Sequence, residues 1–398
     1  MNNQKIKYQN IINKIAVMTA VLSIQITASQ ITYAQTEPKP QLFEGMIGNA
    51  PVVMELTTNT DNTITGRYFY SKHILDIALD GMKLADGHIQ LGENQNYGDD
   101  KRFDMELHPD HDGFRGEWHG HDVKHPKNIA ITLTPIPKKA HQSVFHLSSD
   151  STEYDQIRLA KLSLRQQNIT HFDDYDLQWW LEPISQVSFF RVVKGYPAET
   201  LTRINTALTT RQWQEVNSYF SCQLGGARNS GGDYDVTVTP RFMNDKVLSS
   251  SVESSYYCGG AHPDFSDNPI NINVKTGQEL QLEDVLWVGK TKRITLKRDA
   301  NGQLTDFDYA TNTLGPWVTQ TMIKLYPNEV GSDSQADDDC NYRDPEVWQF
   351  PAFYFTPAGL HLAASFARVA RNCDNPDWAI VPWTIVNQHQ GVLGMSLP

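Results

Sequence analysis

Short runs of alternating apolar and polar residues, separated by turn residues, dominate the chain from residue 42 to residue 137. Examples are residues 64–70 (ITGRYFY), 103–107 (FDMEL) and 129–133 (IAITL). A period of two places every second side chain on the same face, which is typical of a strand buried on one side. The pattern therefore predicts an antiparallel all-β domain, built as a meander, a sandwich or a small barrel.

The second half of the chain mixes strand and helix patterns. Alternating residues predict a hairpin over residues 235–257. Apolar residues three or four apart predict one helix after Tyr196-Pro197 and another over residues 314–326. The strands and helices do not follow a regular strand–helix–strand repeat. We therefore expect an α+β domain over residues 176–395 with a mostly antiparallel sheet, joined to the first domain by a linker over residues 138–175.

The N-terminal 34 residues have the pattern of a secretory signal peptide. Three lysines precede a short apolar run at residues 15–24, and small residues lead up to Ala34. This order predicts cleavage after Ala34 and a periplasmic or secreted protein without stable membrane insertion. The alternative is an uncleaved membrane anchor, but the apolar run is shorter than the ~20 residues that span a bilayer.

The exported part of the chain is acidic. Without residues 1–34 it has 31 basic and 46 acidic residues, a net charge of −15. Such a charge disfavours binding to nucleic acid and to anionic lipid, and it favours cationic partners. The alternative interpretation is that the charge serves solubility alone.

All four cysteines lie in the exported part: Cys222, Cys258, Cys340 and Cys373. An even number of cysteines in an oxidising compartment predicts two disulfides. The spacing favours Cys222 with Cys258 and Cys340 with Cys373, and the two other connectivities remain open. A structural zinc site is less favoured because the chain has no C-x-x-C pair.

Histidines are densest between residues 108 and 125. A hairpin through residues 110–113 would bring His108 near His119, and imidazoles are ligands for zinc or copper. The alternative is a polar turn rich in histidine, and we expect no bound metal or other cofactor, because a metal site needs several converging ligands. The cluster consists of His108, His111, His119, His121 and His125.

An acidic run near residue 337 is the other candidate for metal binding. It includes Asp333, Asp337, Asp338, Asp339 and Asp344. The run lacks the spacing of an EF-hand calcium loop, so it is interpreted as a solvated acidic loop.

His262 is the one candidate general base in the second domain. Asp264 and Asp267 are close in sequence and are the carboxylates available to orient it. No G-x-S-x-G, H-E-x-x-H or P-loop motif occurs in the chain. We therefore name no catalytic residue and expect His262 to shape a loop or contact a ligand.

The second domain resembles the extracytoplasmic domain of RsiV-type anti-sigma factors. The resemblance rests on residues 257–263 (YCGGAHP), 270–280 (ININVKTGQEL), 282–285 (LEDV) and 354–360 (YFTPAGL). The helix after Tyr196-Pro197 is also similar to a segment of PdaC-type peptidoglycan deacetylases. The first two phrases are fairly specific in combination, and the resemblance covers about residues 180–395.

The resemblance implies an α+β domain outside the cytoplasm that binds a ligand. In RsiV the ligand is lysozyme, a basic protein, which is compatible with the acidity of this chain. The sequence departs from the family in three respects: it has no transmembrane helix with a sigma-binding segment, it has no deacetylase domain, and Cys258 replaces a small polar residue. Neither anti-sigma nor deacetylase activity is therefore carried over. The residues expected to contact a ligand are Tyr256, Tyr257, Gly259, Gly260 and His262.

Three hypotheses follow for function. The first is a non-enzymatic binding protein of the cell envelope, with lysozyme, another cationic protein or a cell-wall component as partner. The second is a hydrolase of peptidoglycan or another envelope polymer that uses His262 with a nearby carboxylate. The third is a metal-carrying envelope protein that uses the histidines between residues 108 and 125.

Overall fold

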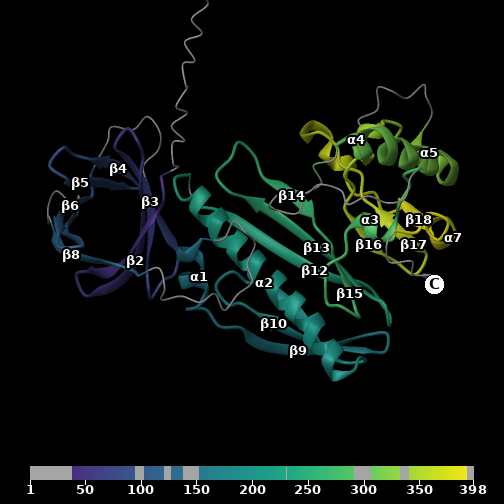
Figure 1. The fold of residues 1–398 in the computed structure, drawn as a ribbon, viewed down its shortest axis with the longest axis horizontal. Coiled ribbons are helices and arrows are strands. Elements are labelled where there is room, and N and C mark those ends of the chain that lie inside the picture. The colour runs from purple at the N-terminus through teal and green to yellow at the C-terminus, as the bar shows by residue number, and fades with distance from the viewer. Residues whose placement is uncertain are drawn as a thin grey trace, which may run out of the picture. The chain divides into compact units, whose positions relative to one another are not determined.

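The fold is known from a computed structural model (Figure 1). It describes residues 38–94, 103–120, 127–137, 152–229, 231–290, 305, 307–331 and 340–391. The expected signal peptide, His121, His125, Asp333 and Asp337 to Asp339 lie outside these ranges. Among the helices within them, none has the length and apolar character needed to cross a membrane.

The first part of the described chain is a closed barrel of antiparallel strands. Each strand pairs with the next, and the last pairs back with the first. Every second side chain points inward, as the alternating pattern predicted, and Met54, Leu79 and Leu107 are fully buried there. The strands are β1 (Gln41–Ile47), β2 (Ala50–Thr58), β3 (Thr63–Tyr70), β4 (Asp76–Lys83), β5 (Ile89–Glu93), β6 (Met105–Asp110), β7 (Gly113–His119) and β8 (Asn128–Pro135).

A long helix and two antiparallel sheets follow the barrel. The helix α2 (Ala198–Gly226) contacts strands of both sheets and buries Ile204, Leu208 and Val216 between them. The first sheet consists of β9 (Arg165–Phe172), β10 (Tyr175–Leu181) and β11 (Ser188–Lys194). The second consists of β12 (Asp233–Met243), β13 (Val247–Tyr257), β14 (Asp264–Asp267) and β15 (Ile270–Asn273). The range expected as a linker holds β9 and the short helix α1 (Glu153–Leu159).

The C-terminal part packs short helices around a small sheet. The sheet contains β16 (Phe353–Phe355), β17 (Gly359–Leu362) and β18 (Ile380–Pro382). Asn271 of β15 donates a hydrogen bond to the carbonyl of Phe353, which joins this sheet to the preceding one. The helical segments are α3 (Leu282–Val285), α4 (Phe307–Tyr309), the π-helical turn η2 (Ala310–Leu314), α5 (Gly315–Leu325), α6 (Pro327–Val330), the 3-10 turns η4 (Pro345–Trp348) and η5 (Arg368–Cys373), and α7 (Trp383–Val386).

The predicted fold class is confirmed. An antiparallel all-β domain precedes a region in which helices pack on antiparallel sheets. The alternation of apolar and polar residues decides which face of a strand is buried, so the sequence alone predicted the fold class. The choice of a barrel among the three predicted architectures depends on the pairing of β1 with β8, which lie far apart in sequence.

Candidate functional site

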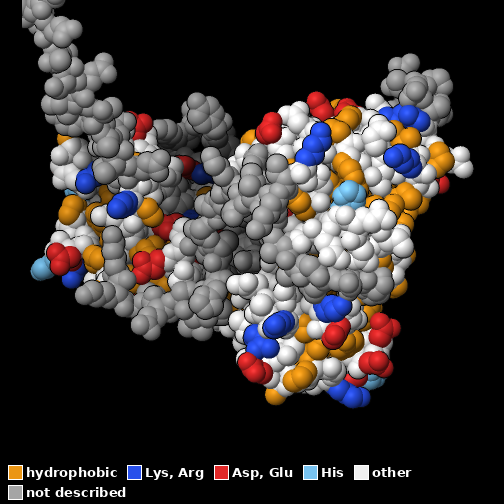
Figure 2. Space-filling view, turned by 45° about the vertical axis from the view of Figure 1, so that its right-hand side comes forward, with side chains coloured by type: hydrophobic (Ala, Val, Ile, Leu, Met, Phe, Trp, Pro, Cys, Tyr) orange, Lys and Arg blue, Asp and Glu red, His pale blue; other side chains and the backbone are white. Residues whose placement is uncertain are grey.

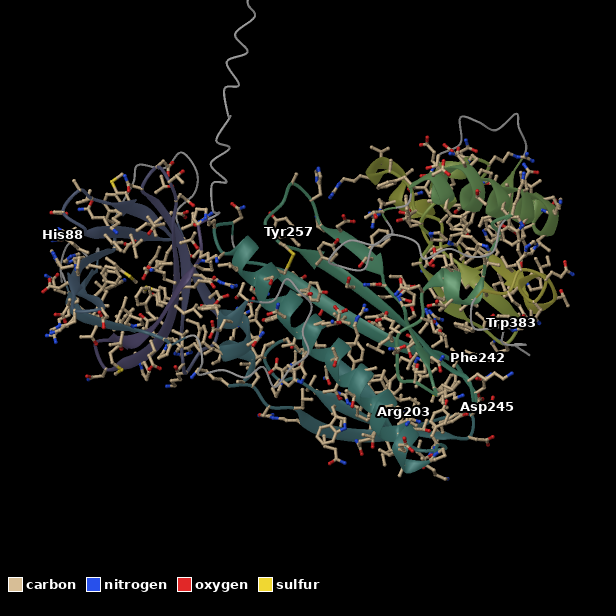
Figure 3. All side chains as sticks on the ribbon, viewed as in Figure 1. His88, Arg203, Phe242, Asp245, Tyr257 and Trp383 are labelled. Atoms are coloured by element: carbon tan, nitrogen blue, oxygen red, sulfur yellow. A yellow bond between two sulfur atoms is a disulfide. The ribbon has the colours of Figure 1, made fainter. Side chains whose placement is uncertain are left out.

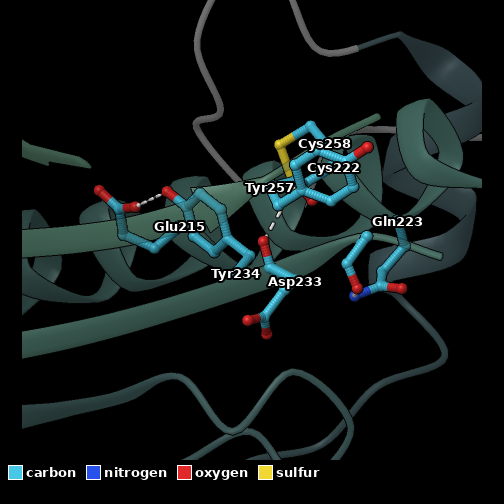
Figure 4. The surroundings of a disulfide bond; sticks show 8 residues. Glu215, Cys222, Gln223, Asp233, Tyr234, Tyr257 and Cys258 are labelled. Atoms are coloured by element: carbon cyan, nitrogen blue, oxygen red, sulfur yellow. Dashed lines mark hydrogen bonds between the residues drawn. A yellow bond between two sulfur atoms is a disulfide. The ribbon is translucent and has the colours of Figure 1, made fainter. Parts of the chain in front are cut away.

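A cleft of about 1340 Å³ lies against α2 and the face of the sheet of β12, β13 and β14. We call it the α2 cleft. Its lining includes Arg211 and Glu215 of α2, Tyr234 of β12 and Tyr256 of β13, and Glu279 lies before α3. Residues 349–353 and Phe307 also line it, so residues that lie far apart in the sequence meet there. Figure 4 shows Glu215 and Tyr234 near the disulfide of Cys222 and Cys258, two further residues of the lining.

A chain of hydrogen-bonded polar groups forms part of the cleft lining. Glu215 accepts hydrogen bonds from the Tyr234 hydroxyl and from Nε of Arg211, both at 2.7 Å. Arg211 also donates to the carbonyl of Asn268 at 2.8 Å. The i,i+4 spacing places Arg211 and Glu215 on one face of α2. Because each charge is paired and hydrogen-bonded, the protein tolerates both groups with little exposure to solvent.

The pKa directions in the α2 cleft follow from this chain. Burial raises the pKa of Tyr234, and the nearby Glu215 carboxylate raises it further, so the phenol stays neutral and donates its hydrogen bond. Desolvation by the surrounding walls raises the pKa of Glu279, although the Arg211 charge opposes the shift. The Glu279 side chain is nevertheless open to solvent. No hydrogen bond or ion pair joins its carboxylate to another residue in the described ranges.

Aromatic side chains accompany these carboxylates. Tyr256 stacks on Tyr234, with ring centroids 6.0 Å apart. Phe307 and Phe350 contact each other edge to face at 5.6 Å, yet they remain 61% and 46% exposed. Exposed aromatic rings inside a cleft offer large apolar area to a ligand at little cost in conformational entropy.

The charge of the lining is predominantly negative. The described lining residues include one guanidinium, that of Arg211, and the carboxylates of Asp155, Glu215, Glu279 and Glu283. On the face of the molecule drawn in Figure 2, by contrast, acidic and basic side chains are interspersed with apolar ones. The α2 cleft can therefore attract a cation and present aromatic surface to it.

The structure places only one of the five expected ligand contacts in this cleft. Tyr256 lines it, whereas Tyr257, the next residue of β13, lies on the other face of the strand because successive side chains alternate. Gly259, Gly260 and His262 lie in the turn between β13 and β14 and are not part of the described lining. Their role in ligand binding stays a prediction.

The turn after β13 requires glycine at only one of its two glycine positions. Gly259 has a φ of +85°, and a Cβ atom there would lie 2.4 Å from the carbonyl oxygen of Gly225. Glycine is therefore required by both backbone conformation and space. Gly260 has open space around its Cα, and its φ is not positive.

His262 has none of the partners that general-base catalysis needs within the described residues. Its side chain is exposed. Asp264 pairs instead with Arg368 and Arg371. Asp267 accepts hydrogen bonds from Ser251 and Asn375. Asp264 and Asp267, the carboxylates considered as partners of the His262 imidazole, thus bind other residues.

Two disulfides join the pairs that the cysteine spacing favoured. Cys222 bonds to Cys258, which fastens the last turns of α2 to the end of β13. Cys340 bonds to Cys373. The first disulfide borders the α2 cleft, since both of its cysteines belong to the lining.

The expectation that His108 meets His119 is wrong. The hairpin pairs Asp110 with Gly113, so His108 lies opposite Arg115, and His119 lies opposite Asn128. His111, at the turn, is 89% exposed. In an antiparallel hairpin, the sequence separation of paired residues grows by two at each step away from the turn. The expected contact of His108 with His119 is not compatible with this rule.

The sequence interpretation missed most of the cleft. The i,i+4 pair of Arg211 and Glu215 was a visible signal on a predicted helix. The presence of Glu279 and Phe350 in the same cleft lining had no signal in the sequence, because it depends on packing between distant segments.

No family model matches this chain, and no curated protein matches it either. Among solved structures, a crystal structure of a DUF3298 family member from Bacteroides fragilis is similar to it. The two chains are 12% identical, and the TM-score is 0.35. The match covers 59% of this chain and 97% of the other.

Proposed function

We propose that this chain is an exported, non-enzymatic binding protein of the cell envelope, and that its α2 cleft binds a cationic segment of a protein such as lysozyme. The carboxylate of Glu279 carries the proposal. It is open to solvent, has no ion-pair partner among the described residues, and lies in a cleft rich in other carboxylates. A carboxylate of this kind is free to form a charge-assisted hydrogen bond with a lysine or arginine of the ligand.

The aromatic lining supports the same class of ligand. Phe350 and Phe307 provide exposed rings in the same cleft as Glu279. A lysine or arginine side chain can pack its aliphatic part or its charge against such rings while its end reaches a carboxylate. The overall charge of −12 adds long-range attraction for a basic protein.

Export is supported by the disulfides. Two disulfides among the described residues are typical of proteins from oxidising compartments. The N-terminal sequence pattern points in the same direction. A position outside the cytoplasm would bring the cleft to cationic proteins of the envelope or its surroundings.

Calorimetry of the protein with hen lysozyme, at low and at physiological salt, tests the proposal. We expect binding that weakens as salt rises, because the attraction between exposed charges is screened. Glu279→Gln should weaken binding about five-fold, the effect of losing roughly 1 kcal/mol from one partly exposed charge pair. Phe350→Ser should weaken it as well.

The control is Glu199→Gln, which removes a carboxylate that is 86% exposed in the first turn of the same helix α2. It should bind like the unaltered protein. The proposal fails if neither lysozyme nor another basic protein binds. It also fails if Glu279→Gln and Phe350→Ser bind as tightly as the control.

A further inference from the structure

Two imidazoles and a carboxylate converge on the outside of the barrel. They belong to His88, His108 and Glu106, and one ligand atom from each lies within 4.8 Å of the others. Figure 3 labels His88 on the barrel. The rings of His88 and His108 meet edge to face with centroids 3.8 Å apart, and Nε2 of His88 contacts Nδ1 of His108.

Strand register produces this arrangement. Ile89 of β5 pairs with Leu107 of β6, and both side chains point into the barrel. Their neighbours His88 and His108 therefore lie opposite each other on the outer face. Glu106 is two residues before His108 on the same strand, so it shares that face.

The turn before β5 orients the His88 ring. The amide of His88 donates to Oδ1 of Asp86 at 3.1 Å, and the other oxygen of this carboxylate lies 3.4 Å from Nδ1 of the ring. The amide of Leu84 closes the turn by donating to the carbonyl of His88 at 2.8 Å. A ring held through Nδ1 presents the lone pair of Nε2 toward His108. A carboxylate behind an imidazole in this way is a common support for a metal ligand.

We propose that His88, His108 and Glu106 bind a divalent transition-metal ion, zinc above all, with a remaining coordination position for water. Imidazole and carboxylate are accepted ligands for zinc, and three protein ligands with one open position are a known arrangement. Copper and nickel suit the same donors, whereas calcium and magnesium prefer oxygen alone. The site uses no residue of the α2 cleft and does not depend on the proposed function.

Neighbouring charges are compatible with a cation. Glu117 lies opposite Glu106 on β7 and adds a negative charge to the outer face. Arg115 lies opposite His108, but its guanidinium is paired with Asp110. The local balance therefore does not repel a divalent ion.

The test is titration of the untagged protein with zinc by calorimetry, together with the visible absorption of bound cobalt. We expect one zinc per chain and a cobalt absorption spectrum typical of coordination by imidazole. His88→Asn and His108→Asn should each weaken zinc binding more than ten-fold. Asp86→Asn should weaken it about ten-fold with the cobalt spectrum retained, as for a residue that positions a ligand.

His111→Asn is the matched control. His111 is on the same barrel, has the same side chain and is 89% exposed, but it is not one of the three ligands. Its φ of +52° is a conformation that asparagine tolerates. Unchanged circular dichroism would show that each variant is folded.

Two results would overturn the proposal. One is the absence of stoichiometric zinc binding to the unaltered protein. The other is zinc binding that survives in the His88→Asn/His108→Asn double variant but is lost when His119, His121 and His125 are replaced together, which would assign the metal to the other histidines.

Discussion

At the scale of single residues, His361 shows how burial makes one side chain sensitive to pH. It is fully buried on β17, stacks on Tyr354 with centroids 4.2 Å apart, and contacts the carbonyl of Pro376 through Nε2 at 2.9 Å. Burial lowers the pKa of His361, and the Pro376 carbonyl and Asp377 oppose this shift only in part. The imidazole is therefore neutral in the folded protein over a range where the unfolded chain would protonate it.

We predict that the free energy of unfolding falls as pH drops below about 6.5, the ordinary pKa of histidine in an unfolded chain. Below that value the unfolded state binds a proton that the folded state refuses, so protonation favours unfolding. Above it both states are neutral and the residue contributes no pH dependence. Urea unfolding at several pH values measures the effect, which amounts to about 1.4 kcal/mol for each unit between the two pKa values.

His361→Gln should remove this part of the pH dependence, at the cost of lower stability at neutral pH. The comparison is His171→Gln, since that side chain is 77% exposed. An unchanged slope between pH 7 and pH 5 in His361→Gln would contradict the argument.

At the scale of elements, local patterns predicted more than pairings did. The alternating residues 64–70 form β3, and the hairpin expected over 235–257 consists of β12 and β13. The contact of His88 with His108 was not foreseen, because the register of β5 with β6 spans a long connection. Side-chain period is a local property, whereas register and cleft walls depend on tertiary packing.

The Cys222–Cys258 disulfide controls how α2 is fastened to β13. The two cysteines are 36 residues apart in sequence. Closing such a loop lowers the entropy of the unfolded chain, which stabilises the folded state by about 4 kcal/mol in the entropy model. Cys222→Ala/Cys258→Ala should therefore be strongly destabilised in thermal unfolding. Because the disulfide borders the α2 cleft, lysozyme binding should weaken as well.

The Cys340→Ala/Cys373→Ala variant separates the two effects. Its cysteines close a loop of similar length, 33 residues apart, but neither belongs to the described cleft lining. It should lose comparable stability and bind normally at temperatures where it is folded. Equal loss of binding in both variants would show that the first disulfide has no special influence on the cleft.

At the scale of the whole molecule, a buried ionic cluster joins the barrel to the helices that follow it. Arg158 of α1 is fully buried and pairs with Asp76 of β4 and with Asp155. Arg67 of β3 pairs with Asp155 at 3.1 Å. Burial alone would lower the pKa of Arg67, but Asp155, Glu55 and Asp76 raise it, so the guanidinium stays charged. Apolar residues of the barrel, such as Phe69, pack into the same core as Tyr154 and α2.

This arrangement predicts that unfolding of the barrel is coupled to unfolding of α2. Arg158→Met is similar in volume but removes one of the two buried arginines that pair with Asp76 and Asp155, which should cost about 3–5 kcal/mol. Hydrogen exchange should then accelerate in β4 and in α2 together, because Arg158 also donates to Asn217 at 3.0 Å and lies over the Phe220 ring at 4.5 Å. Arg165→Met, at an exposed position of β9, should change exchange little in either element. If Arg158→Met accelerated exchange in α1 alone, the cluster would be a local cap, and the barrel would unfold independently of the helices.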